Sequence, residues 1–223
     1  MRIWIAALAL SVAAPAFAQV PPAEPTAPPP VTAPPPTAAT PTPPSPPAYA
    51  VVHVRLTTSE GPITLAIEKQ RAPISAGYFL KYVDQKRLDG TVFYRAVKVA
   101  PGYGLIQGGP RNDPKRVLPA IPHEPTSKTG LSHTDGTISF ARGAPGTATG
   151  DFFIVIGDLS TMDADPKQPG DNQGFAAFGH VIEGMDIVKR ILDEPTSATA
   201  GPATMKGQML VQPIKILTAR RTD

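Results

Sequence analysis

Short stretches with a period of two run through most of this 223-residue chain and constrain its fold more than any other feature. Residues 52–57 alternate between apolar and polar side chains, and residues 63–67 repeat the alternation after a tight turn at Glu60-Gly61. Such alternation is typical of half-buried strands. Further strands rich in β-formers are expected at residues 92–97, 105–109, 137–141, 152–156, 175–181 and 210–217.

Only two segments have helical spacing instead. Apolar residues recur at three and four after Pro73, as far as Val83, and again over residues 185–191. Residues 110–136 have weak periodicity and many prolines, and residues 157–174 are acidic and marked by Gly and Pro, so both segments are expected to be loops. An antiparallel sheet of about seven or eight strands must hide its edges, and closure into a barrel does so. The predicted fold is therefore all-β: a closed eight-stranded antiparallel barrel, capped by two α-helices and filled by side chains, with its site on an outer face.

The N-terminus has the features of a secretory signal peptide over residues 1–18. Arg2 supplies the positive start, an almost wholly apolar run follows, and Ala16-Phe17-Ala18 is a small-x-small cleavage pattern. The mature chain would then begin at Gln19. An uncleaved anchor is the alternative, but the run is shorter than the roughly 20 residues that a membrane span needs. The expected location is periplasmic or secreted, without stable membrane insertion after signal cleavage.

Residues 19–49 consist mostly of Pro, Ala and Thr. Proline fixes φ and donates no backbone hydrogen bond, so this stretch is expected to be an extended linker rather than part of a packed core. It is interpreted as a tether, with a ligand for proline-binding modules or an intramolecular substrate as alternatives. Residues 50–223 remain as one domain with a single core.

Most familiar catalytic chemistry has no carrier in this sequence. There is no cysteine, and the formal net charge of +3 is scattered, so neither thiolate chemistry nor a nucleic-acid partner is indicated. The Asp163-Ala164-Asp165 loop lacks the later residues of a calcium loop. No histidines stand at metal-ligand spacing; the four are His53, His123, His133 and His180. Either the domain only binds, or its reaction needs no metal, cofactor or nucleophile. Rotation about an X-Pro bond is such a reaction.

Four stretches carry a family resemblance, and they occur in order on the predicted strands. Phe93-Tyr94-Arg95 resembles a Phe-His-Arg strand, and Leu105 to Gly109 resembles Ile-Gln-Gly-Gly. Residues 136–154 resemble Gly-Thr-Ile-Ser-Met-Ala followed by Ser-Gln-Phe-Phe-Ile, and residues 178–185 resemble Phe-Gly-x-Val-x-x-Gly-Met. Over residues 50–219 the chain is similar to the cyclophilin-type peptidyl-prolyl cis-trans isomerases.

This resemblance implies a reaction and a set of site residues. The catalytic residues would be Arg95, Gln107 and Phe153, with Arg95 as the main one, Gln107 contacting the peptide and Phe153 lining the proline pocket. The expected substrate-binding residues are Leu105, Phe175, Asp151, Ala141 and Arg142. The partners would be proline-containing peptides and unfolded proteins, bound by a monomer without cofactor.

The chain departs from the family pattern at several positions. Asp151 stands where Gln is common, so that a peptide-backbone donor becomes an acceptor, and Gly104 stands in place of a Phe. Phe175 aligns with a pocket His, and the only Trp is Trp4, in the signal segment. Many members of the family have a Trp in the preceding loop that contacts cyclosporin, so its absence from that loop predicts weak cyclosporin binding. The resemblance also leaves two alternatives to the enzyme: a non-catalytic chaperone or scaffold module that binds Pro-peptides, and a structural barrel whose Pro-rich arm does the binding.

Overall fold

The computed structural model describes residues 49–222 with the exception of residue 168. These residues belong to one compact unit that spans residues 46–223. The expected signal peptide at 1–18, and the expected linker at 19–49 except for Tyr49, lie outside the described residues. None of the described helices is both long and apolar enough to cross a bilayer.

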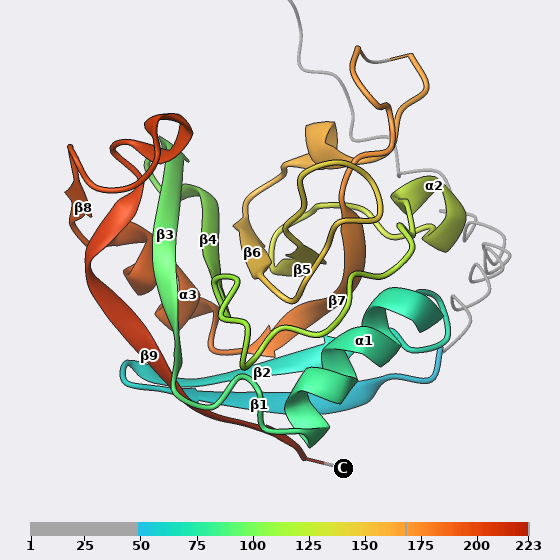
Figure 1. The fold of residues 1–223 in the computed structure, drawn as a ribbon, viewed down its shortest axis with the longest axis horizontal. Helices are drawn as coiled ribbons and strands as arrows, with labels where there is room; N and C mark the ends of the chain where they lie inside the picture. The colour runs from blue at the N-terminus through green and yellow to red at the C-terminus, as the bar shows by residue number, and fades with distance from the viewer. Residues whose placement is uncertain (1–48, 168, 223) are drawn as a thin grey trace, which may run out of the picture. The chain divides into compact units, whose positions relative to one another are not determined.

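The strands form one closed antiparallel sheet, drawn in Figure 1. Its order is β1-β2-β7-β5-β6-β4-β3-β9, and β9 pairs back onto β1 to close the ring. This confirms the predicted eight-stranded barrel. A further strand of two residues, β8, pairs only with the start of β9. The bounds are β1 Val52–Thr58, β2 Gly61–Ile67, β3 Thr91–Ala100, β4 Tyr103–Gly109, β5 Thr137–Phe140, β6 Phe152–Ile156, β7 Ala176–Glu183, β8 Thr196–Ser197 and β9 Met209–Arg221.

Two helices cover the barrel, as expected, but they are not the only ones. Helix α1 (Pro73–Asp84) follows β2 at one end of the barrel, and α3 (Met185–Asp193) packs beside the β1–β2 turn at the other end (Figure 1). The described residues also contain a third helix of a single turn, α2 (Thr126–Thr129), within residues 110–136, where the sequence predicts a loop. Four residues are too few for a helical period to be visible in a sequence. Single 3₁₀ turns occur at Ser160–Met162 and Ala203–Met205.

The segment before α2 stabilises the start of α1. Ala72, at the N-cap, has no side-chain acceptor for the free N–H groups of the first turn. The buried carboxylate of Glu124 takes that role, accepting hydrogen bonds from the backbone N–H of Ile74 at 3.3 Å and of Ser75 at 2.8 Å. A carboxylate is also favoured there by the helix dipole. The long loop is thereby attached to the barrel.

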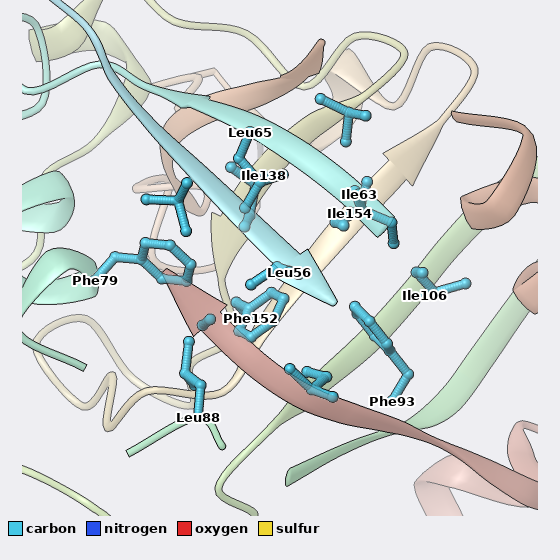
Figure 2. Packing of buried hydrophobic residues seen from close by; sticks show 14 of the residues in the cluster. Leu56, Ile63, Leu65, Phe79, Leu88, Phe93, Ile106, Ile138, Phe152 and Ile154 are labelled. Carbon is cyan, nitrogen blue, oxygen red and sulfur yellow. The ribbon is translucent and has the colours of Figure 1, made fainter. Parts of the chain in front are cut away.

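The inside of the barrel is filled by packed side chains, shown in Figure 2. Phe152 of β6 lies between Phe79 of α1 and Phe93 of β3, with ring centroids 5.6 Å and 5.7 Å apart and both pairs edge-to-face. Ile106 and Ile154 are fully buried in the same cluster. Because an interior packed in this way has no room for a ligand, any binding site must lie outside the barrel wall, as the sequence predicted.

The hairpin between β3 and β4 contains two glycines with positive φ, Gly102 and Gly104, whose surroundings differ. A Cβ atom on Gly104, where φ is +153°, would lie 1.9 Å from the carbonyl oxygen of Val97, whereas a Cβ atom on Gly102, where φ is +66°, would meet nothing within 4 Å. Both Gly→Ala changes bear the cost of a positive φ, about 1–2 kcal/mol. Only Gly104→Ala adds a backbone clash, so we expect a loss of about 3 kcal/mol or more in the free energy of unfolding. Urea titration of both variants checks this, and equal losses would contradict it.

Candidate active site

The three expected catalytic residues lie side by side on neighbouring strands. Arg95 of β3 is the cross-strand partner of Gln107 of β4, and Gln107 is the partner of Phe153 of β6. Adjacent strands are about 4.8 Å apart, so the backbones of Arg95 and Phe153 are separated by about 10 Å. The structure therefore brings a cation, an amide and an aromatic ring into one row across the outer face of the barrel.

A β-bulge at Tyr94 places Arg95 on this face. Phe93 pairs with Gly108 and Arg95 pairs with Gln107, which leaves Tyr94 as the extra residue of β3. A regular strand would turn residues 93 and 95 to the same face. The bulge breaks this alternation, so Phe93 fills the barrel while Tyr94 and Arg95 both bond to the side chain of Gln107 outside it.

The guanidinium of Arg95 is held by two amide oxygens. Its Nη1 donates to Gln107 Oε1 at 2.7 Å, while Nε and Nη2 donate to Gln208 Oε1 at 2.8 Å and 2.5 Å. Partial burial of the guanidinium lowers the pKa of Arg95, and Tyr94 acts in the opposite direction. Three of the five guanidinium N–H groups are engaged by these residues, so one on Nη1 and one on Nη2 carry no hydrogen bond to the described part of the chain.

Gln208 was not identified from the sequence. It is 113 positions from Arg95 and immediately precedes β9, which is paired with β3. Its backbone carbonyl also accepts a hydrogen bond from the N–H of Ala96, at 2.8 Å. A glutamine in a polar segment gives no local signal of such a role, because the contact exists only once the two strands are paired.

An apolar cluster separate from the barrel core adjoins the row. It consists of Leu105, Phe153, Val155 and Leu159, with the partly buried Val97, Tyr103, Ala141, Met162 and Phe175 packed against it. The rings of Phe153 and Phe175 meet edge-to-face with centroids 5.4 Å apart. Phe175 was expected to begin a strand, but β7 starts one residue later. The expected pocket residues Leu105, Phe153 and Phe175 are thus brought together on one apolar surface.

A fully buried histidine lies behind this surface. The His133 ring stacks on Phe153 with centroids 5.9 Å apart and an interplanar angle of 18°. Its Nδ1 is 2.5 Å from Asp163 Oδ1, and its Nε2 is 3.0 Å from Ser139 Oγ. No sequence pattern indicates this place for His133. The described residues contain no cluster of three or more metal-ligating side chains. The contact between His133 and Phe153 depends on β5 lying next to β6.

The other expected substrate-binding residues line a groove of about 670 Å³ beside the row. Its lining includes Asp151, Ala141 and Arg142 together with Tyr94 and Gln107, and also Met205, Met209 and Leu210. A groove of this size suits a short stretch of extended peptide.

Within the groove, two charged residues are already engaged by the protein. Asp151 accepts hydrogen bonds from the Tyr94 hydroxyl at 2.9 Å and from the Arg111 backbone N–H at 2.8 Å. The Arg142 guanidinium donates to the Gly174 carbonyl and to Asp171, at 2.7 Å, and lowers the pKa of the Asp171 carboxyl to about 2. Arg142 therefore shapes the rim and ties it to the 157–174 loop.

Comparison with known proteins agrees with this architecture. The family model for cyclophilin-type peptidyl-prolyl cis-trans isomerases matches residues 53–220. A peptidyl-prolyl cis-trans isomerase of Acinetobacter baylyi is 34% identical over 174 residues, covering 78% of this chain and 87% of the relative. Peptidyl-prolyl cis-trans isomerase A of Dickeya dadantii is 36% identical over 160 residues, covering 70% and 80%.

Solved structures show the same fold. A crystal structure of a cyclophilin-type isomerase of Cryptosporidium parvum superposes with a TM-score of 0.61 at 21% identity, covering 78% of this chain and 99% of the other. A second structure of that protein, determined in the presence of the dipeptide Ala-Pro, gives a TM-score of 0.59 at 20% identity, covering 77% and 99%. This chain belongs to the cyclophilin family. It is a peptidyl-prolyl cis-trans isomerase, the enzyme class that accelerates rotation about X-Pro bonds.

His133 predicts how stability depends on pH. Burial lowers the pKa of its imidazole in the folded state, and the hydrogen bond to Asp163 opposes this only in part. An unfolded histidine binds a proton below about pH 6.5, so under those conditions the unfolded state holds more protons than the folded state. We expect the free energy of unfolding to fall between about pH 7 and pH 5. Urea titrations across this range check it, and the slope should be smaller in His133→Gln. An unchanged slope in that variant would contradict the assignment.

Proposed function

We propose that this cyclophilin is exported and isomerises X-Pro bonds in incompletely folded proteins outside the cytoplasm, with Arg95 as its main catalytic residue. The N-terminal signal pattern over residues 1–18 supports export. An open groove beside the row suits an extended chain rather than a folded surface. One chain supplies every residue of the row, so a monomer suffices.

The reaction is limited by amide resonance. Rotation about the X-Pro bond must cross a barrier of about 18–20 kcal/mol, because twisting removes the partial double bond. In the twisted state the proline nitrogen regains its lone pair and becomes a hydrogen-bond acceptor. A donor that reaches this nitrogen stabilises the transition state without stabilising the planar ground state, which is the condition for a faster reaction.

The observation that carries the proposal is the position of Arg95. Its guanidinium is fixed on two sides by amide oxygens, and two N–H groups are left over to donate to a peptide. Such preorganisation is the usual source of electrostatic catalysis, since little reorganisation is needed during the reaction. Phe153 and its apolar neighbours lie two strands away, where they can hold the proline ring while the preceding residue turns.

Arg95→Ala should therefore lower turnover much more than it lowers peptide affinity. One charge-assisted hydrogen bond contributes roughly 1.5–3 kcal/mol, equivalent to about ten-fold to one-hundred-fold in rate. Cis/trans exchange of a short Ala-Pro peptide, measured by NMR with residues 50–223 and with the variant, checks this. Arg190→Ala is a matched control, because Arg190 is an exposed arginine on α3 that bonds Asp186 and the Glu60 carbonyl.

The outcomes distinguish the enzyme from a binding module. Fast exchange that is lost in Arg95→Ala and kept in Arg190→Ala is the expected result. Exchange no faster than that of the free peptide, with peptide binding still detectable, would show a domain that recognises proline without turning it over. An equal loss of turnover and of affinity in Arg95→Ala would remove the transition-state role of Arg95.

Export has its own test. Expressed as the full chain in a Gram-negative host, the protein should be recovered from the periplasm with Gln19 as its first residue, as measured by intact mass. Replacing Ala16 and Ala18 by Arg should block cleavage, because the signal peptidase requires small residues at these positions. A periplasmic protein that retains residues 1–18, or a protein confined to the cytoplasm, would overturn the proposed location.

A further inference from the structure

We propose that Asp151 and Tyr94 are positioning residues that act on Arg95 through Gln107, so that the charge on Asp151 fixes which end of the Gln107 amide faces the guanidinium. This inference rests on the proposed role of Arg95. The four side chains, Asp151, Tyr94, Gln107 and Arg95, are called the relay below.

The relay is a continuous chain of hydrogen bonds. Arg95 Nη1 donates to Gln107 Oε1 at 2.7 Å, and Gln107 Nε2 donates to the Tyr94 hydroxyl oxygen at 2.7 Å. The Tyr94 hydroxyl in turn donates to Asp151 Oδ2 at 2.9 Å. Tyr94 and Gln107 are almost completely buried, with exposed fractions of 5% and 6%, so water does not readily replace these bonds.

The direction of each bond follows from the one before it. A carboxylate can only accept, so the single hydroxyl hydrogen of Tyr94 is committed to Asp151. The Tyr94 oxygen must then accept from Gln107, which turns the NH₂ group of that amide toward Tyr94. The carbonyl of Gln107 consequently faces Arg95 and holds its guanidinium. A reversed amide would direct NH₂ at the guanidinium, donor against donor.

Other residues keep the carboxylate at the end of the relay in place. The backbone N–H of Arg111 donates to Asp151 Oδ1 at 2.8 Å, and the Arg111 guanidinium lies 4.8 Å from the Tyr94 ring centroid. A Cβ atom on Gly109 would lie 2.7 Å from Asp151 Oδ1, so the approach requires glycine. Burial raises the pKa of the Asp151 carboxyl, whereas the hydrogen bonds from Arg111 and Tyr94 favour its ionised form.

The relay also connects two departures from the family pattern. Tyr94 stands at the central position of the Phe-His-Arg stretch, and Asp151 stands where Gln is common. In the structure these two residues are hydrogen-bonded to each other. Each carboxylate oxygen of Asp151 already accepts one hydrogen bond from the protein. We therefore infer that Asp151 acts within the protein, on Arg95, rather than directly on the peptide.

A double-mutant cycle separates these two roles. Tyr94→Phe and Asp151→Asn each break the relay with little change of shape, and each should reduce turnover about ten-fold, with peptide affinity nearly unchanged. The double variant should lose no more turnover than either single variant, because each single change already interrupts the same chain of hydrogen bonds. Tyr78→Phe is the matched control: Tyr78 is also 5% exposed and hydrogen-bonded, to the Leu118 and Pro119 carbonyls, but it lies on α1. It should leave turnover unchanged.

The ¹H–¹⁵N NMR signals of the Arg95 guanidinium give a readout that does not depend on activity. They should shift in Tyr94→Phe and in Asp151→Asn in a similar way, and stay in place in Tyr78→Phe. Losses of turnover that add in the double variant, or Arg95 signals that do not change in the single variants, would overturn the relay. If the wild-type protein showed no isomerase activity, the proposed function would fail, and the guanidinium signals would still decide the relay.

Discussion

The structure depends first on the closure of its sheet. β9 pairs with β1 on one side and with β3 on the other, and without this double pairing the barrel would open along two strand edges. Closure creates an interior that packed side chains fill completely, including the edge-to-face rings around Phe152. A filled interior leaves only the outer wall for binding. Closure of the sheet also brings Gln208, which immediately precedes β9, into hydrogen-bonding contact with Arg95.

The bulge at Tyr94 places polar side chains on the outer wall of the barrel, where the candidate site lies. Elsewhere in the row the strands alternate regularly, so Ile106 and Ile154 point inward while Gln107 and Phe153 point outward. Only in β3 does an extra residue allow a core phenylalanine to be followed by two outward polar side chains. The guanidinium then lies on the same outer face of the barrel as the Gln107 amide and the Phe153 ring on the neighbouring strands.

The polar part of the site is built from groups that fix one another. An arginine in water loses side-chain entropy when it binds, and here that entropy has already been lost on folding. Gln107 and Gln208 hold Arg95 through neutral oxygens rather than through a carboxylate, so its positive charge is not neutralised and remains available to a ligand. The negative charge of Asp151 acts on Arg95 through two intervening side chains, Tyr94 and Gln107. On the apolar side, Phe153 is supported by His133 in a similar way, from behind.

The sequence by itself determined the strand pattern, the two main helices and the three residues of the row, because strand alternation and helical spacing are local properties and the resemblance rests on contiguous motifs. It did not reveal that Tyr94 is a bulge residue, since two adjacent outward side chains depend on the register of β4. Nor did it indicate Gln208, His133 or the capping of α1 by Glu124. Each of these contacts joins segments distant in the chain, and such contacts are decided only when the barrel closes and fixes which side chains meet.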